Sequence, residues 1–159
     1  LSWLKSNYLI NKDCIFSPIV YKSNIVSLFK NKKQKILIAY ASSGLLKRDK
    51  LILKRLEYLH NEKNNIEIIY YPHPHLNIQI ANNLVPHFKK VRFIYSKRFK
   101  NIDLLVTGFS SLGFDYLNLN IKVLFIKYDD LICAFNDNSV EVIENETLLP
   151  AKLKKMINI

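Results

Sequence analysis

The fold is decided by the stretch KILIAYASSGLLKRDKLILKRLEYLHNEKNNIEIIYY, which covers residues 35–71. Its two ends, residues 36–40 and 66–71, are apolar runs of strand length. Between them, apolar residues recur at near-helical spacing, and Lys and Arg remain for the opposite side of the helix. The apolar positions are Leu46, Ile52, Leu53, Leu56 and Leu59. A strand, a helix over residues 45–61 and a second strand predict a right-handed crossover between parallel strands.

The same alternation continues toward the end of the chain. Further runs of strand length lie at residues 91–95, 102–107 and 123–126, and an alternating edge-strand pattern lies at residues 139–143. Shorter helical patterns lie at residues 76–88, 111–119 and 146–157. Pro150 either interrupts the last helix or lies in its first turn. This alternation predicts an α/β fold, a Rossmann-like doubly wound parallel sheet, in which ligands bind beyond the carboxyl ends of the strands.

The character of the chain changes near Lys35. Residues 1–34 show no clean periodicity, and we interpret them as an interdomain connection or a packed extension. Residues 35–159 have the length of one domain with its own hydrophobic core. The first residue is Leu rather than Met, so we expect an excised domain or a partial chain.

The composition favours a globular domain with anionic partners. Hydrophobic residues make up 49% of the chain, and neither a membrane-spanning run nor a signal peptide is present, which predicts a soluble cytoplasmic protein. Lys and Arg total 24 against 13 acidic residues, which favours nucleic acid, acidic lipid headgroups or phosphorylated donors, unless the lysines only solubilise the surface. The basic residues are spread out and form no nucleic-acid-binding motif, so we expect no nucleic-acid partner. Peripheral contact with the inner face of the membrane stays open.

A rigid histidine corner follows the second predicted strand. The sequence Pro72-His73-Pro74-His75 breaks the strand, and its prolines restrict where the imidazoles of His73 and His75 point. Imidazole changes charge near neutral pH, so these groups would hydrogen-bond phosphate oxygens or protonate a leaving phosphate. A turn that merely contains histidines is the alternative. No Cys or carboxylate lies nearby in the sequence, so we expect no metal site.

A second phosphate-binding pattern follows the fourth predicted strand. Thr107 and Gly108 end the strand, and Ser110, Ser111 and Leu112 begin a predicted helix. A serine N-cap, a glycine that lets the backbone turn and unpaired helix N–H groups together bind anions through hydrogen bonds and the helix dipole. An ordinary capped turn is the alternative, but both patterns fall at the same edge of the sheet, which favours a site for a phosphorylated ligand.

Three other features of the sequence bear on which ligands and reactions the chain can support. Asp129, after the fifth predicted strand, would meet a ribose, an amine or an acceptor hydroxyl at the same edge, or lie in a solvated turn. The three glycines form neither a phosphate loop nor a dinucleotide fingerprint, so we expect no ATPase activity and no cofactor. Cys14 and Cys133 are isolated, which indicates buried or indifferent thiols.

These residues resemble a known family. Residues 102–117, IDLLVTGFSSLGFDYL, with the Tyr-Asp pair at residues 128–129, resemble the signature of the CDP-glycerol glycerophosphotransferases. Those enzymes build teichoic-acid-like and capsular polymers on a two-domain GT-B fold, and their His-Pro corner matches His73 and its proline. Gly108 stands where the family usually has Asp, Lys122 where Pro is common, and the first strand lacks the usual Ala-Pro-Thr ending.

The resemblance implies a cytidine nucleotide donor, CDP-glycerol, and a glycan or polymer acceptor. By this resemblance His73 would contact the donor phosphate, Ser110 and Ser111 would anchor the same group, and a missing N-terminal acceptor domain would supply the catalytic base. Bacterial sialyl- and polysialyltransferases, which use CMP-sialic acid, share a His-Pro motif and a Ser-Ser motif and are an alternative. A non-catalytic remnant that keeps the fold and a basic nucleic-acid-binding domain are the rival classes.

Overall fold

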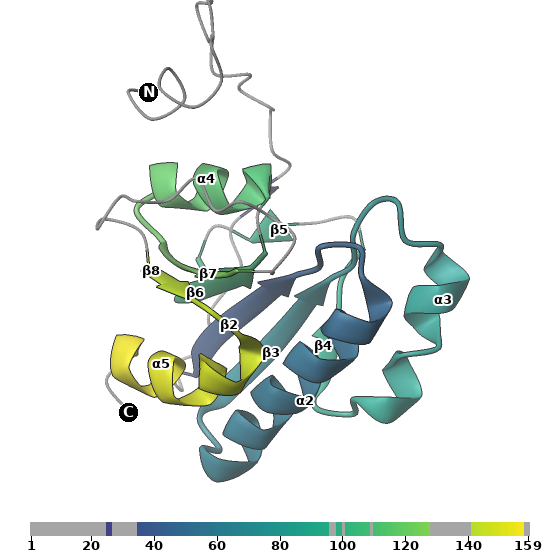
Figure 1. Cartoon of the computed structure of the whole chain (residues 1–159), viewed down its shortest axis with the longest axis horizontal. Coiled ribbons are helices and arrows are strands. Elements are labelled where there is room, and N and C mark those ends of the chain that lie inside the picture. Colours follow the sequence, from purple (N-terminus) through teal and green to yellow (C-terminus); the bar gives the residue numbers. More distant parts are fainter. Residues whose placement is uncertain are drawn as a thin grey trace, which may run out of the picture.

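The computed structural model of the chain describes residues 25–26, 35–95, 98–99, 101–108, 110–127 and 141–157. Its centre is a six-stranded sheet in which every neighbouring pair is parallel. In spatial order, the strands are β4 (Val91–Phe93), β3 (Ile66–Tyr71), β2 (Ile36–Ala41), β6 (Leu104–Thr107), β7 (Lys122–Ile126) and β8 (Glu141–Ile143). A separate parallel pair joins β1 (Ile25–Val26) to β5 (Arg98–Phe99). The predicted doubly wound α/β fold is confirmed (Figure 1).

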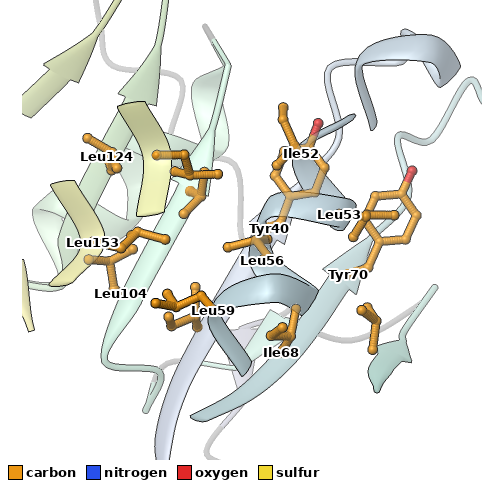
Figure 2. Packing of buried hydrophobic residues seen from close by; sticks show 14 of the residues in the cluster. Tyr40, Ile52, Leu53, Leu56, Leu59, Ile68, Tyr70, Leu104, Leu124 and Leu153 are labelled. Atoms are coloured by element: carbon orange, nitrogen blue, oxygen red, sulfur yellow. The ribbon is translucent and has the colours of Figure 1, made fainter. Parts of the chain in front are cut away.

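Helices cover both faces of the sheet. They are α2 (Leu46–Glu62), α3 (Ile78–Asn82), α4 (Ser111–Asn118) and α5 (Leu149–Met156), with the short 3-10 helices η1 (Val85–His87) and η2 (Glu146–Leu148). Side chains alternate between the two faces along each strand. Tyr40 and Tyr70 therefore pack with α2 and α5, whereas Leu105 and Phe125 pack with Tyr116 of α4 on the other face. Figure 2 shows the core that α2 and α5 cover.

Two prolines decide how the predicted helices are divided. The helix predicted over residues 76–88 is broken into α3 and η1. Pro86 lies in the first turn of η1, and a continuous helix would bring its ring against the carbonyl of Asn82, the last residue of α3. Pro150 lies in the first turn of α5, which confirms one of the two alternatives for this residue. None of the helices within the described ranges has the length and apolar character that a bilayer crossing requires.

The structure tests the predicted edge strand near residue 140, but it describes little of residues 1–34. The alternating pattern near residue 140 forms β8, which is an edge strand as predicted. The interpretation of residues 1–34 as a connection or extension concerns a segment that, apart from β1, lies outside the described residues.

The strand order changes direction between β2 and β6. Strands β3 and β4 are added on one side of β2, and β7 and β8 continue from β6 on the other. At this point Ala41 is in register with Tyr71 of β3 and with Thr107 of β6. The turns that follow these three residues therefore leave the sheet side by side. In open α/β sheets a ligand binds in the crevice at this position.

Candidate functional site

A pocket of about 220 Å³ lies where the carboxyl ends of β2, β3 and β6 meet. Three turns form its walls: the end of β2, the histidine corner after β3 and the start of α4. The lining residues are Ala41, Ser42, Tyr71, Pro72, His73, Pro74, Ser110, Ser111 and Leu112. Complete small-molecule sites typically measure about 300 to 1,000 Å³, so this pocket suits one part of a ligand.

Hydroxyl groups connect the start of α4 to β2. The Thr107 hydroxyl donates to the carbonyl oxygen of Ala41 at 3.3 Å and lies 3.0 Å from the Ser110 hydroxyl. Since a hydroxyl has only one hydrogen, Ser110 is the donor in the second bond. Ser110 Oγ also accepts from the N–H of Gly113 at 3.4 Å, which makes Ser110 the N-cap of α4. The predicted cap is confirmed, and its hydroxyl hydrogen is already used inside the protein.

The next two residues of α4 are the ones available to a ligand. Ser111 is exposed, Leu112 is half-buried, and both line the pocket. The first N–H groups of a helix have no partner within the helix and carry its positive dipole end. Gly113 allows this end to lie close to the sheet, since a Cβ at Gly113 would approach the ring of Phe125 and the methyl group of Thr107. The start of α4 thus has the features of an anion-binding helix terminus.

His73 lines the same pocket as the start of α4, and a hydrogen bond occupies one nitrogen of its ring. Its Nδ1 accepts the backbone N–H of His75 at 3.2 Å, and its carbonyl oxygen accepts the N–H of Leu76 at 2.9 Å. When the imidazole is neutral, an accepting Nδ1 leaves the proton on Nε2. Burial, and then the charge of His75, lower the pKa of His73 below its usual value, whereas the charge of Asp49 acts in the opposite direction. The lowered pKa favours the neutral form of His73, in which Nε2–H is the donor.

The turn after β2 forms the floor between these two walls. Ser42 is buried, and its Oγ accepts the N–H of Gly44 at 2.9 Å. Gly44 has a φ of +87°, a conformation that side-chain-bearing residues rarely adopt, and its open side faces the ring of His73. Ser43 Oγ is buried and finds no hydrogen-bond partner within the described part of the chain. The turn therefore lies beside the ring of His73.

Behind the turn, Asp49 of α2 is completely buried. Its carboxylate accepts hydrogen bonds from the hydroxyls of Tyr40, Ser42 and Tyr70. Sequence reasoning missed this cluster. The available signal was an acidic residue within the apolar stripe of a helix, seven residues before Leu56 and three before Ile52.

The structure separates the predicted site residues into four groups. His73, Ser110, Ser111 and Leu112 line the pocket. Thr107 and Gly108 are buried directly behind it. His75 is exposed outside the lining, with its ring centroid 5.2 Å from that of His73. Asp129 lies outside the described residues.

The chemistry of the pocket is polar but has little charge. No Lys, Arg, Asp or Glu within the described ranges lines it, so the hydrogen-bond donors for an anion are the His73 ring N–H and the N–H groups of the helix terminus. The described residues also contain no cluster of three or more His, Cys, Asp or Glu side chains able to hold a metal ion. Such a site can hydrogen-bond an anion directionally, through one imidazole and the backbone N–H groups of a helix.

Comparison with protein families identifies a match over most of the chain. The family model described as CDP-Glycerol:Poly(glycerophosphate) glycerophosphotransferase matches residues 20–152. This range includes the whole pocket. No curated protein sequence matches the chain significantly.

Solved structures share the fold at low sequence identity. The UDP-GlcNAc 2-epimerase from Neisseria meningitidis bound to UDP-GlcNAc is 12% identical, with a TM-score of 0.62 over 82% of this chain and 38% of that chain. The S. aureus MnaA–UDP structure is 14% identical, with a TM-score of 0.61 over 86% of this chain and 41% of that chain. The C-terminal domain of the glycosyl transferase group 1 family protein LpcC from Francisella tularensis is 12% identical, with a TM-score of 0.53 over 86% of this chain and 88% of that domain.

These similarities establish the fold class. The Rossmann-like sheet matches one half of a GT-B-type architecture. The chain spans about two fifths of the length of the epimerase and MnaA chains that it resembles.

Proposed function

We propose, because this chain belongs to the CDP-glycerol:poly(glycerophosphate) glycerophosphotransferase family, that it forms the donor-phosphate site of a transferase in bacterial surface polymer synthesis. One observation carries the proposal: His73 and the start of α4 line one pocket at the point where the strand order changes direction. Both are hydrogen-bond donors suited to phosphate oxygens. The pocket volume suits the phosphates of a nucleotide rather than the whole molecule.

The donor that we propose is a cytidine nucleotide, CDP-glycerol. Family membership supports CDP-glycerol, and the nucleotides named for two structural neighbours, UDP and UDP-GlcNAc, support a nucleoside diphosphate bound to this fold. CMP-sialic acid, the donor of sialyl- and polysialyltransferases, is the alternative. Gly108 in place of the family's usual Asp is the feature that favours considering it.

We propose a direct displacement at phosphorus. An acceptor hydroxyl of a glycan or polymer attacks the phosphorus that carries glycerol, its proton passes to a base outside the pocket, and the bond to CMP breaks with both electrons going to CMP. His73 Nε2–H and the N–H groups of Ser111 and Leu112 would stabilise the charge that grows on the departing phosphate. We propose that the base comes from the N-terminal acceptor domain; none of the described residues that line the pocket is a carboxylate.

The proposed domain organisation follows the same logic. Residues 35–159 would be the C-terminal nucleotide-donor-binding domain, and residues 1–34 would connect it to an N-terminal acceptor domain. The coverage of 88% of the LpcC C-terminal domain supports this assignment. The net charge of +11 supports peripheral contact with an anionic membrane surface, where the acceptor polymer would be presented.

Thermal unfolding of the chain with CDP, CMP, UDP, GDP or inorganic pyrophosphate tests the proposal. A ligand at one hundred times its Kd stabilises the folded state by about 2.7 kcal/mol. We expect CDP to raise the Tm more than UDP or GDP, His73→Gln to lose most of that rise, and His87→Gln to keep it, because His87 is an exposed histidine of η1 outside the pocket. A wild-type chain whose Tm responds to none of these compounds contradicts the proposal, and the non-catalytic remnant then explains the fold better. If binding instead responds to oligonucleotides and falls steeply with salt, the nucleic-acid class is correct.

A further inference from the structure

Asp49 is the one fully buried acidic side chain within the described residues. It lies in the first turn of α2, on the helix face that otherwise carries Ile52, Leu53 and Leu56. Removing a carboxylate from water is unfavourable unless hydrogen bonds replace the lost hydration. An apolar residue at this position would extend the hydrophobic stripe with no such requirement. The presence of Asp therefore calls for an explanation beyond helix packing.

Three hydroxyl donors surround the Asp49 carboxylate. The Tyr40 hydroxyl donates to Oδ1 at 2.5 Å, and the hydroxyls of Ser42 and Tyr70 donate to Oδ2 at 2.6 and 2.7 Å. The two tyrosines extend from neighbouring strands, and their hydroxyls point toward the start of α2 (Figure 2). The two tyrosines hold the carboxylate to the sheet, and among its described hydrogen-bond partners Ser42 is the one that also lines the pocket.

From Ser42 the connection continues to His73. Ser42 Oγ gives its hydrogen to Asp49 and accepts the Gly44 N–H at 2.9 Å, so the orientation of the serine sets the shape of the Ser42–Gly44 turn. A Cβ at Gly44 would lie 3.4 Å from Cγ and 3.5 Å from Nδ1 of His73. The ring of His73 therefore lies beside the turn, with its Nδ1 side toward Gly44 and with space for about one methyl group between them.

We propose that Asp49 is a positioning residue of the donor site, which acts through Ser42 and the turn at Gly44 to hold His73 in line with the start of α4. This proposal depends on the proposed function in one respect, namely that the ligand of the pocket is a donor phosphate. Asp49 does not itself line the pocket, which keeps its negative charge behind the turn and away from a bound anion.

The charge of Asp49 supplies a readout that a purely structural role would not affect. The charged groups that act on His73 within the described chain are His75 of the same corner and Asp49 of α2. Asp49 raises the pKa of His73 against the effect of burial. Removing the carboxylate charge is therefore expected to lower the pKa of His73 further, in addition to any change in stability.

Three variants of the chain test the proposal: Asp49→Asn, Ser42→Ala and, as the matched control, Tyr40→Phe. Tyr40→Phe removes a hydrogen bond to the other carboxylate oxygen and leaves the Ser42 connection in place. The measurements are the Tm, the affinity for CDP and the pH titration of the His73 ring by NMR. We expect Asp49→Asn and Ser42→Ala each to weaken CDP binding by about tenfold, with the double variant no weaker than the worse single one. Tyr40→Phe should lower the Tm but keep CDP affinity within about twofold.

The outcomes separate this inference from the proposed function. If Asp49→Asn and Tyr40→Phe lower the Tm alike while CDP affinity and the His73 titration stay as in the wild type, Asp49 is only structural and the inference is wrong. If Asp49→Asn does not fold, Ser42→Ala decides: unchanged CDP affinity and unchanged His73 ring resonances overturn the inference. If the wild type binds no CDP, the proposed function fails, and the inference is then judged by whether Asp49→Asn, unlike Tyr40→Phe, moves the His73 titration downward.

Discussion

Gly113 of α4 lies so close to Phe125 of β7 that a Cβ added to the glycine would stand 2.5 Å from Cε1 of the phenylalanine ring. The same Cβ would lie 3.1 Å from Cγ2 of Thr107, the last residue of β6. The absence of a side chain at one helical position therefore sets the distance between the start of α4 and the sheet. Because Ser111 and Leu112 precede Gly113 directly, this distance also sets the position of the helix N–H groups in the pocket.

Gly113→Ala should destabilise the protein and displace α4. Overpacking of this kind typically lowers the free energy of unfolding by about 1 to 3 kcal/mol. Urea unfolding measures the loss, and Phe125→Leu offers the compensating change because it removes the ring atoms that clash. We expect the double variant to be more stable than the sum of the two single losses predicts. Simple additivity of the two losses would show that the clash is not the cause.

The two serines at the start of α4 should separate stability from binding. Ser110→Ala removes the N-cap and should lower the free energy of unfolding by about 0.5 to 2 kcal/mol, whereas exposed Ser111→Ala should change it by less than about 0.5 kcal/mol. Both variants should weaken CDP binding. Ser110→Asp is the sharper variant, because Asp preserves the cap but places a negative charge beside the proposed phosphate site. A Ser110→Asp protein that binds CDP as tightly as the wild type would argue against an anion at this helix terminus.

The pKa of His73 should rise when His75 loses its charge. Burial is the larger cause of the lowered pKa and His75 the next, so His75→Gln should raise the pKa of His73 toward the usual value without restoring it fully. NMR titration of the ring resonances measures the shift. His87→Gln is the control, since that exposed histidine lies in η1 and should leave the His73 titration unchanged. An unchanged titration in His75→Gln means that the corner does not hold the two rings together in solution.

The same lowered pKa predicts how stability depends on pH. Unfolded histidine titrates near about 6.5, and a lower folded pKa means that the unfolded chain binds the proton more readily. The contribution of His73 to stability is therefore complete above that value and decreases as the pH falls through the folded pKa. Urea unfolding at several pH values should show a shallower decrease in His73→Gln than in the wild type. Identical pH profiles for the two proteins would contradict this assignment.

Gly44→Ala should lose stability through its backbone rather than through a clash. The φ of +87° is strained for any residue with a side chain, at roughly 1 to 2 kcal/mol, while the contact of 3.4 Å to His73 is ordinary van der Waals distance. Ser43→Ala is the matched control in the same turn. Because Ser43 Oγ is buried without a partner in the described residues, its removal should leave stability unchanged or increase it. Thermal unfolding of both variants tests the contrast, which fails if Ser43→Ala is the less stable of the two.

Local patterns in the sequence were sufficient to predict most of the strands, helix α2 and the segments that form two walls of the pocket. The alternation of apolar runs and amphipathic segments determined strands β2, β3, β6, β7 and β8 and helix α2, because the periods of strands and helices are properties of neighbouring residues. The proline-stiffened corner at His73 and the capped helix at Ser110 were visible for the same reason. The break between α3 and η1 is local in the same way, because in a continuous helix the ring of Pro86 would clash with the carbonyl of Asn82, four residues earlier.

Only the tertiary structure decided how these pieces act together. The register of Ala41 with Tyr71 and Thr107 joins turns that are 30 or more residues apart in the sequence, and strand register depends on pairing across the whole sheet. The same is true of Asp49, whose hydrogen bond with Tyr70 joins residues 21 positions apart. A buried carboxylate and its hydroxyl donors become recognisable as one cluster only when the strands and α2 are packed, because burial and hydrogen-bond geometry are absent from the linear chain.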